Sequence, residues 1–235
     1  QMVNRDFSGR LKQTGHPAMM IDDPRVGVVI LNRKALPTAQ KNEHNIKEKD
    51  CGERHFMVTS KPKLPTPQDS IQAIKFDTDN GKIWLNEQRM LLVDAGVMAQ
   101  LKADLISSLG SERAKLFLMR FGYHAGVKDA EVSSKLRPHM SPEKVFLAGP
   151  QMHNIRGMVK VVPVELVFDV EAGTYHGVFN WFDSYEAGVY AKEQGHLAES
   201  PVCWTLLGYA SGYTSYFMGK SIIYQEVACT AMGHE

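Results

Sequence analysis

Residues 158–183 read MVKVVPVELVFDVEAGTYHGVFNWFD, and this stretch decides what kind of fold the chain adopts. Met158–Val170 alternates along its length and is rich in valine, which is typical of a β-strand. Residues 171–174 (EAGT) have the composition of a tight turn, and Tyr175–Asp183 then forms the returning strand. The stretch therefore predicts an antiparallel β-hairpin.

Downstream of the hairpin, the pattern changes to a helix and a last strand. Ser200-Pro201 begins the helix, which runs to about Gly219, and Ile222–Cys229 is the final strand. Small residues let another backbone approach a helix closely, so we expect tight packing along this one. The small residues are Gly208, Ala210, Ser211, Gly212 and Ser215.

Upstream of the hairpin, two longer helices are expected. Ala95–Leu109 has helical spacing and stops at Gly110, a suitable C-terminal residue. Ser111 then begins a second helix, on which apolar residues recur along one face. The residues of that face are Ala114, Phe117, Leu118, Phe121 and Ala125.

Two shorter elements complete the upstream part. Lys82–Leu85 is a strand candidate, and Ser141-Pro142 is a good helix start, with a capping hydroxyl before a proline in the first turn. This helix carries Phe146 and is expected to end near Gly149-Pro150. Together, the elements predict an α/β (α+β) domain over residues 76–235, with mixed helices and antiparallel hairpins.

Residues 1–75 differ in composition. They are interrupted by prolines, and the stretch 41–54 is strongly charged, so they bury little apolar surface. We expect a poorly ordered extension with one strand at Val26–Leu31; a wholly disordered tail is the alternative.

Composition excludes several classes of protein. A hydrophobic content of 43% is enough for a core, and the net charge of +1 does not favour nucleic-acid binding by this segment. We find no apolar run long enough to span a membrane and no signal-peptide pattern. Three cysteines, an odd number, argue against a disulfide framework and for a reducing, cytoplasmic setting.

Cys203, Glu226 and Cys229 form a candidate zinc site, because two thiolates and a carboxylate can hold zinc tetrahedrally. Cys203 is expected in the first turn of the last helix, and the other two at the end of the last strand, so zinc would clip these elements together. His234 or Glu235 could complete the set. The alternative is that the cysteines are small buried hydrophobes.

A pocket for an aromatic molecule is the second candidate site. Aromatic side chains expected to face the core fall on separate elements: Phe146, Phe179, Trp181, Tyr213 and Tyr224. His153 follows the expected helix break at Gly149-Pro150, so we expect its ring on an irregular loop. With the indole N–H of Trp181 it could bind one phenolic oxygen. An ordinary aromatic core with a structural histidine remains the alternative.

Other motifs fail. Gly219-Lys220-Ser221 resembles the end of a phosphate-binding loop, but Thr214 stands where its first glycine should be. The sequence has no nucleophile elbow, zinc-protease helix or dinucleotide fingerprint. Asp183 and Glu186 are expected to cap a helix and face solvent rather than form a catalytic pair.

Several blocks between Gly81 and Glu235 match one known family. The blocks are GKIWL at 81–85, EQRML at 87–91, ERAK at 112–115, GPQMH at 149–153, GMVKVVP at 157–163, WFDS at 181–184 and PVCWTLLGY at 201–209. They closely resemble the N-terminal sensory domains of the aromatic-responsive, sigma-54-dependent transcription activators of the XylR/DmpR group. The resemblance implies an activator-type part over residues 76–184, and residues 185–235 resemble the 4-vinyl reductase domain of other small-molecule sensors.

The resemblance implies a cytoplasmic homodimer that binds phenols and represses an adjoining ATPase domain until effector binds. DNA binding would belong to a later domain. His153 and Trp181 match the positions that hold the phenol hydroxyl in this family, and His153 implies a phenolic effector. The positions that match the aromatic cage are Phe146, Phe179, Tyr213 and Tyr224.

The resemblance also implies a structural zinc ion held by three cysteines and one glutamate. Cys203, Glu226 and Cys229 match three of these ligands, and the fourth would fall just past Glu235. Two other interpretations stay open. One is a small enzyme, a reductase or zinc hydrolase acting on an aromatic substrate. The other is a dimerisation module that uses the small-residue helix and the first strands.

Overall fold

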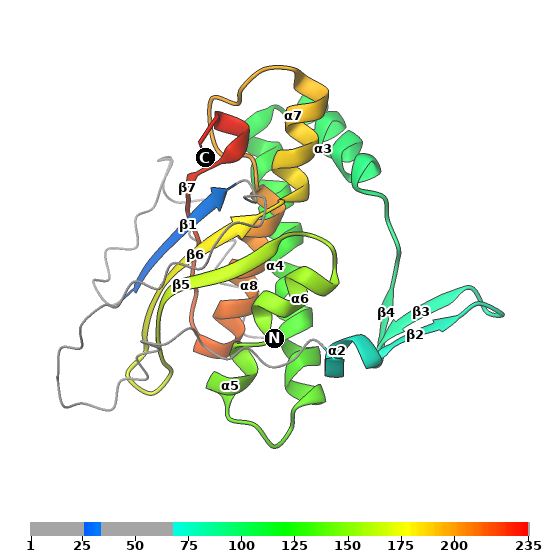
Figure 1. The fold of residues 1–235 in the computed structure, drawn as a ribbon, viewed down its shortest axis with the longest axis vertical. Coiled ribbons are helices and arrows are strands. Elements are labelled where there is room, and N and C mark those ends of the chain that lie inside the picture. Colours follow the sequence, from blue (N-terminus) through cyan, green and yellow to red (C-terminus); the bar gives the residue numbers. More distant parts are fainter. Residues whose placement is uncertain (1–25, 34–67, 235) are drawn as a thin grey trace, which may run out of the picture.

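The computed structural model describes residues 26–33 and 68–234 (Figure 1). Helices and strands alternate in it without a repeating unit, which confirms the predicted α+β class. The elements are β1 (Val26–Arg33), α2 (Gln68–Gln72), β2 (Ile74–Asp77), β3 (Lys82–Leu85), β4 (Gln88–Met90), α3 (Ala95–Leu109), α4 (Ser111–Leu136), α5 (Pro142–Phe146), α6 (Gly149–Ile155), β5 (Lys160–Asp169), β6 (Thr174–Phe182), α7 (Tyr185–Gln194), α8 (Trp204–Met218), β7 (Glu226–Ala228) and a 3₁₀ turn (Thr230–Met232).

The predicted hairpin forms one side of the main sheet, with β5 as an edge strand. β5 and β6 pair antiparallel from Lys160 opposite Phe182 to Asp169 opposite Thr174, with a bulge just after Pro163, which has no N–H for the ladder. The strand order is β5-β6-β1-β7. Burial alternates along β6, so every second side chain points into the core.

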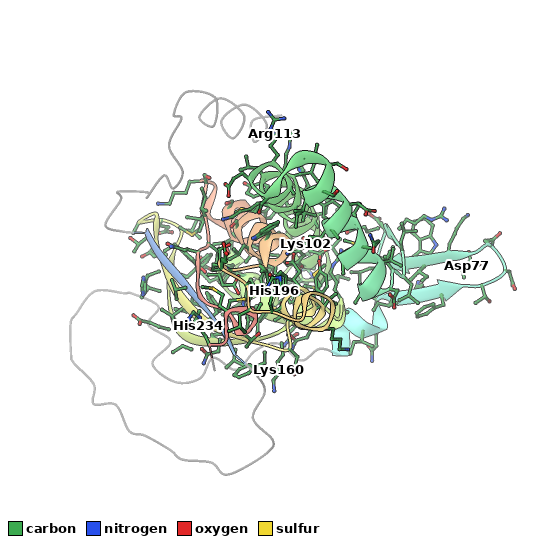
Figure 2. The ribbon with its side chains drawn as sticks, turned by 90° about the horizontal axis from the view of Figure 1, so that it is seen from above. Asp77, Lys102, Arg113, Lys160, His196 and His234 are labelled. Carbon is green, nitrogen blue, oxygen red and sulfur yellow. The ribbon has the colours of Figure 1, made fainter. Side chains whose placement is uncertain are left out.

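The strand expected at Val26–Leu31 is confirmed as β1, which extends to Arg33. It pairs parallel with both β6 and β7 and so lies inside the sheet. The rest of the expected extension falls largely outside the described residues. The boundary expected near residue 75 falls within β2, which pairs with β3 and β4 in a second, antiparallel sheet. This small sheet, which carries Asp77, projects away from the main sheet and its helices (Figure 2).

Helices α4 and α8 lie side by side behind the main sheet (Figure 1) and are in close backbone contact. A Cβ atom built on Gly126 of α4 would lie 2.1 Å from the Tyr209 carbonyl oxygen, and one on Gly212 of α8 would lie 2.0 Å from the Tyr123 carbonyl oxygen. Gly122 and Gly208 make equivalent approaches one turn away. The tight packing expected for the small-residue helix is therefore confirmed, and its partner is a helix of the same chain.

The glycine contact corrects the face predicted for α4. Phe117 and Phe121 were expected with Ala114 and Leu118 on one apolar face, but they are 54% and 51% exposed. The buried face of α4 runs instead from Leu118 through Gly122 and Gly126 to Asp129 and Ala130. The predicted face was chosen from the spacing of large apolar side chains. Glycine has no such side chain, so the prediction missed positions where the backbone itself is buried.

Three predicted boundaries were also wrong. The short helix α5 ends at Phe146, and Gly149-Pro150 begins α6 instead of breaking a helix, because proline is well tolerated in a first helical turn. The last helix begins at Trp204 rather than at Ser200-Pro201. The last strand is limited to β7 and does not cover Ile222–Cys229. Within the described residues, no helix combines the length and apolar character that crossing a membrane requires.

Candidate ligand pocket and metal cluster

A pocket lies between α5, α6, the inward face of β6 and one side of α8, with about 360 Å³ of space between atoms that includes open solvent. The structure brings all six predicted ligand-binding residues to its wall. The residues that line it are Phe146, Gly149, Pro150, His153, Val161, Phe179, Trp181, Tyr209, Ala210, Tyr213, Thr214 and Tyr224.

Rings in contact form most of this wall. The His153 ring centroid lies 5.8 Å from that of Trp181, and the Phe179 centroid lies 5.8 Å from that of Tyr224. The ring centroids of Phe146 and Tyr213, which also line the pocket, are 6.0 Å apart. Phe179 and Trp181 are two residues apart on β6, so the strand pleat turns both rings the same way.

His153 is a helical residue, which corrects the expectation of an irregular loop: it belongs to α6 and is 4% exposed. Its Nδ1 has no hydrogen-bond partner among the described residues. Burial and the nearby Arg156 guanidinium lower the pKa of His153 to about 3, so the ring is neutral near pH 7. A neutral imidazole has one N–H donor and one nitrogen acceptor, and Trp181 adds an indole N–H.

A second group of polar atoms reaches the pocket wall through hydroxyls. The Tyr224 hydroxyl is hydrogen-bonded to the Tyr175 hydroxyl and lies 2.9 Å from Oγ1 of Thr214. Burial raises the pKa of Tyr224 to about 12, so this chain of hydroxyls is uncharged.

Sequence reasoning missed Tyr209 and Thr214 as pocket residues. Helical spacing could have found Tyr209, because it precedes the predicted pocket residue Tyr213 by one turn and so shares a face of α8 with it.

The three predicted metal ligands converge. One ligand atom each from Cys203, Glu226 and Cys229 lies within 4.8 Å of the others, and all three residues are buried. Cys203 is the N-cap of α8 rather than part of its first turn, and its backbone N–H donates to Glu226 Oε2 at 3.1 Å. The cluster therefore joins the start of α8 to β7, as expected from the sequence.

Two thiols and a carboxylate are the donor types that bind zinc, so the cluster fits the metal chemically. Burial raises the pKa of Cys203, while a hydrogen bond with Cys203 lowers the pKa of Cys229. Of the fourth ligands expected from the sequence, His234 accepts the Cys229 N–H through Nδ1 at 3.0 Å, and Glu235 lies outside the described residues.

Glu186 corrects another expectation, because it caps a helix without facing solvent. It is 5% exposed, and its carboxylate accepts the backbone N–H groups of Thr205 and Leu206 at the start of α8. The Nζ atom of Lys102, on α3, lies 3.5 Å from Oε1 of Glu186. Burial raises the pKa of Glu186. Asp183 is exposed, so the two acids do not form a buried pair.

Fold and pocket together define an α+β domain with an aromatic-walled pocket, and comparisons specify the family. The family model described as "Activator of aromatic catabolism" matches residues 69–169. The phenol regulator MopR of Acinetobacter guillouiae is 49% identical over 168 residues, which are 72% of this chain and 30% of that protein. The transcriptional regulatory protein XylR of Pseudomonas putida is 46% identical over 180 residues, 76% of this chain and 32% of that protein.

A solved structure of the phenol-responsive sensory domain of the transcription activator PoxR with phenol is also similar. It is 41% identical, has a TM-score of 0.68, and the match covers 72% of this chain and 83% of that one. The chain therefore belongs to the family of N-terminal sensory domains of XylR/DmpR-type transcription activators.

The resemblance seen in the sequence is thus confirmed, and the chain spans about a third of the length of the curated relatives. The matched proteins are regulators, so the interpretation as a reductase or zinc hydrolase is not supported. The likeness of residues 185–235 to 4-vinyl reductase domains stays a prediction, because the family model ends at residue 169.

Proposed function

We propose that this chain is the effector-sensing domain of a transcription activator, and that its pocket binds phenol or a closely related small aromatic molecule. Two relatives support phenol as the ligand: MopR is a phenol regulator, and the PoxR sensory domain was solved with phenol.

The observation that carries the proposal is a polar group without a partner in an aromatic cavity. His153 is buried in the pocket wall, and its Nδ1 has no partner among the described residues. A buried polar atom left unpaired costs free energy, which a guest that pairs with it recovers. Phenol suits this site, because its oxygen can accept the Trp181 N–H and donate its proton to a neutral imidazole.

The remaining affinity comes from contact between the flat guest and the aromatic wall. Phenol has seven heavy atoms, and at a ceiling of about 1.5 kcal/mol per atom its binding free energy is limited to about 10 kcal/mol. Micromolar binding requires about 8 kcal/mol and is within reach, whereas nanomolar binding, at about 12 kcal/mol, is not.

Calorimetry with phenol and toluene tests the proposal. Toluene fills the same space but leaves His153 unpaired, so phenol should bind more tightly by roughly 1–3 kcal/mol. His153→Leu should remove this preference, while His139→Leu, at an exposed position, should leave it unchanged. Equal affinities of the wild-type chain for both molecules would contradict the polar anchor.

We also propose that Cys203, Glu226 and Cys229 hold a structural zinc ion. Three acidic donors in a buried space repel one another when ionised, and a bound cation relieves this repulsion. Their placement at the N-cap of α8 and in and after β7 makes the ion a clip between elements rather than part of the pocket.

The remaining parts of the proposal concern the intact regulator. Effector binding shifts an equilibrium between two arrangements and relieves repression of a downstream ATPase domain, in a cytoplasmic homodimer. The segment itself binds no nucleic acid, in agreement with its net charge of +1. Thermal-shift measurements on the full-length regulator, with and without phenol, combined with its ATPase rate, test this coupling.

A further inference from the structure

A buried acid outside the pocket connects to two of the elements that build it. Asp129 of α4 is 0% exposed. Arg156 donates to it through two nitrogens, Nε to Oδ2 and Nη2 to Oδ1, each at 2.5 Å. The Tyr209 hydroxyl donates to Oδ2 at 2.5 Å. One carboxylate of α4 therefore holds a guanidinium of α6 and a phenolic hydroxyl of α8.

The Arg156 contact controls the helix that carries the histidine. Arg156 is the C-cap residue of α6 and follows His153 by three positions, so both residues project from nearly the same face of the helix. A two-point guanidinium–carboxylate contact fixes direction as well as distance. It therefore sets the rotation of α6 about its axis, and with it the direction of the imidazole.

The Tyr209 contact controls the surface on which that imidazole rests. The Tyr209 and His153 ring centroids are 4.2 Å apart, with the planes at 77°. Because its hydroxyl is bonded to Asp129, Tyr209 presents its ring to the pocket and does not offer this group to the oxygen of a guest.

His153 depends on such neighbours because Nδ1, one of its two ring nitrogens, has no hydrogen bond to hold the ring among the described residues. The orientation of the imidazole is set by packing against Tyr209 and Trp181 and by the position of α6. Two of these three constraints lead back to the same carboxylate.

We propose that Asp129 is a positioning residue for the pocket: through Arg156 and Tyr209 it holds His153 in the orientation that receives a hydroxyl, and so it determines the preference for a hydroxylated aromatic over its methyl counterpart. This inference rests on the proposed function and deepens it, since it assigns the selectivity of the pocket to a residue that does not line it.

The test measures selectivity rather than stability, because a merely structural role would not change selectivity. Asp129→Asn and Tyr209→Phe keep side-chain volume and remove the charge and the hydroxyl, respectively. Calorimetry with phenol and toluene on the whole chain gives a ratio of affinities for each variant. Glu131→Gln is the matched control, because it breaks an exposed ion pair with Lys128 on the same helix.

We expect Asp129→Asn to weaken phenol binding about 10- to 100-fold and toluene binding less than about 3-fold, so that the ratio falls toward one. Tyr209→Phe should lower the ratio about 3- to 10-fold, since Arg156 still holds α6. Glu131→Gln should keep the wild-type ratio.

Variants that melt earlier but keep the wild-type ratio would overturn the inference and leave the proposed function standing. If Asp129→Asn does not fold, Tyr209→Phe decides, because it leaves the ion pair with Arg156 in place. A wild-type chain with no preference for phenol would instead overturn the proposed function.

Discussion

The pocket and the metal cluster lie at different places along the same helix, and their buried polar groups differ in kind. The pocket contacts the middle of α8 through Tyr209, Ala210, Tyr213 and Thr214, whereas the cluster begins at its N-cap, Cys203. In the pocket, His153 is neutral, and its Nδ1 has no hydrogen-bond partner in the part of the chain that the structure describes. In the cluster, three acidic groups come within 4.8 Å of one another.

This difference teaches what each site requires. Burial penalises charge, so an isolated polar group in a low-dielectric site stays neutral and is completed by a neutral partner such as a hydroxyl. Several acids that lie close together repel one another once they are ionised. A neutral partner does not remove this repulsion, whereas a bound cation does. One helix therefore contributes residues to both proposed sites, one for an uncharged guest and one for a metal ion.

The largest expected effect concerns the cluster. Cys203→Ala should abolish zinc binding and cost about 4 kcal/mol, because the clip between α8 and β7 is lost, which corresponds to a fall in Tm of about 8–16 °C. Phenol affinity should change by less than about 3-fold, since the pocket does not include Cys203. Elemental analysis, thermal melting and calorimetry measure the three quantities.

Ser200→Ala, at an exposed position nearby, is the matched control and should leave zinc content and Tm unchanged. If the wild-type chain contains no zinc and Cys203→Ala melts at the same temperature, the zinc site is refuted. Cys203 and Cys229 would then be ordinary buried thiols.

An intermediate effect concerns the pH dependence of stability. The pKa of His153 is about 3 in the folded chain and about 6.5 when unfolded. As pH falls below 6.5 the unfolded chain binds a proton that the folded chain does not, so the free energy of unfolding decreases. At pH 5 the loss is about 2 kcal/mol.

Urea unfolding at pH 7 and pH 5 measures this loss, and His153→Gln, which cannot titrate, serves as the control. The wild-type chain should lose about 2 kcal/mol more than the variant between the two pH values. Identical losses would mean that the imidazole titrates normally, and the pocket would then no longer be a site built around a neutral ring.

The smallest effect concerns the hydroxyls at the pocket wall. Tyr224→Phe removes the middle member of the Tyr175–Tyr224–Thr214 chain. Phenol affinity should fall by less than about 3-fold, because the hydroxyls of this chain already have partners and His153 supplies the anchor. Calorimetry measures the change. A fall of tenfold or more would mean that the phenol oxygen binds to the hydroxyl chain rather than to His153.

Much of the fold could be predicted because it depends on local patterns. Alternation identified β5 and β6, and the Ser141-Pro142 start and the Gly110 stop identified two helix ends. The same reasoning failed where backbone packing outweighed hydrophobicity. Phe117 and Phe121 are exposed because Gly122 and Gly126 face α8, and the i, i+4 spacing of those glycines was the signal that went unread.

The candidate sites divide in the same way. The aromatic residues and the Cys203, Glu226 and Cys229 set were recognisable from residue type and from the family resemblance. Asp129 was not, because an acid in a helix beside Lys128 and Glu131 has the local pattern of a solvated surface. Its burial becomes visible only once Arg156 and Tyr209 arrive from other elements.

The sequence alone thus determined the main hairpin and its turn, the strands β1 and β3, the helices α3, α4, α5 and α8, and the residue types of both sites, since these follow from interactions between near neighbours along the chain. Only the tertiary structure decided which charged groups are buried, which nitrogen of His153 has no partner among the residues described, and that Asp129 is bonded to the helix beside the pocket. The physical reason is that desolvation and ion pairing depend on what surrounds a group in space, and those surroundings are contributed by residues far away in the chain.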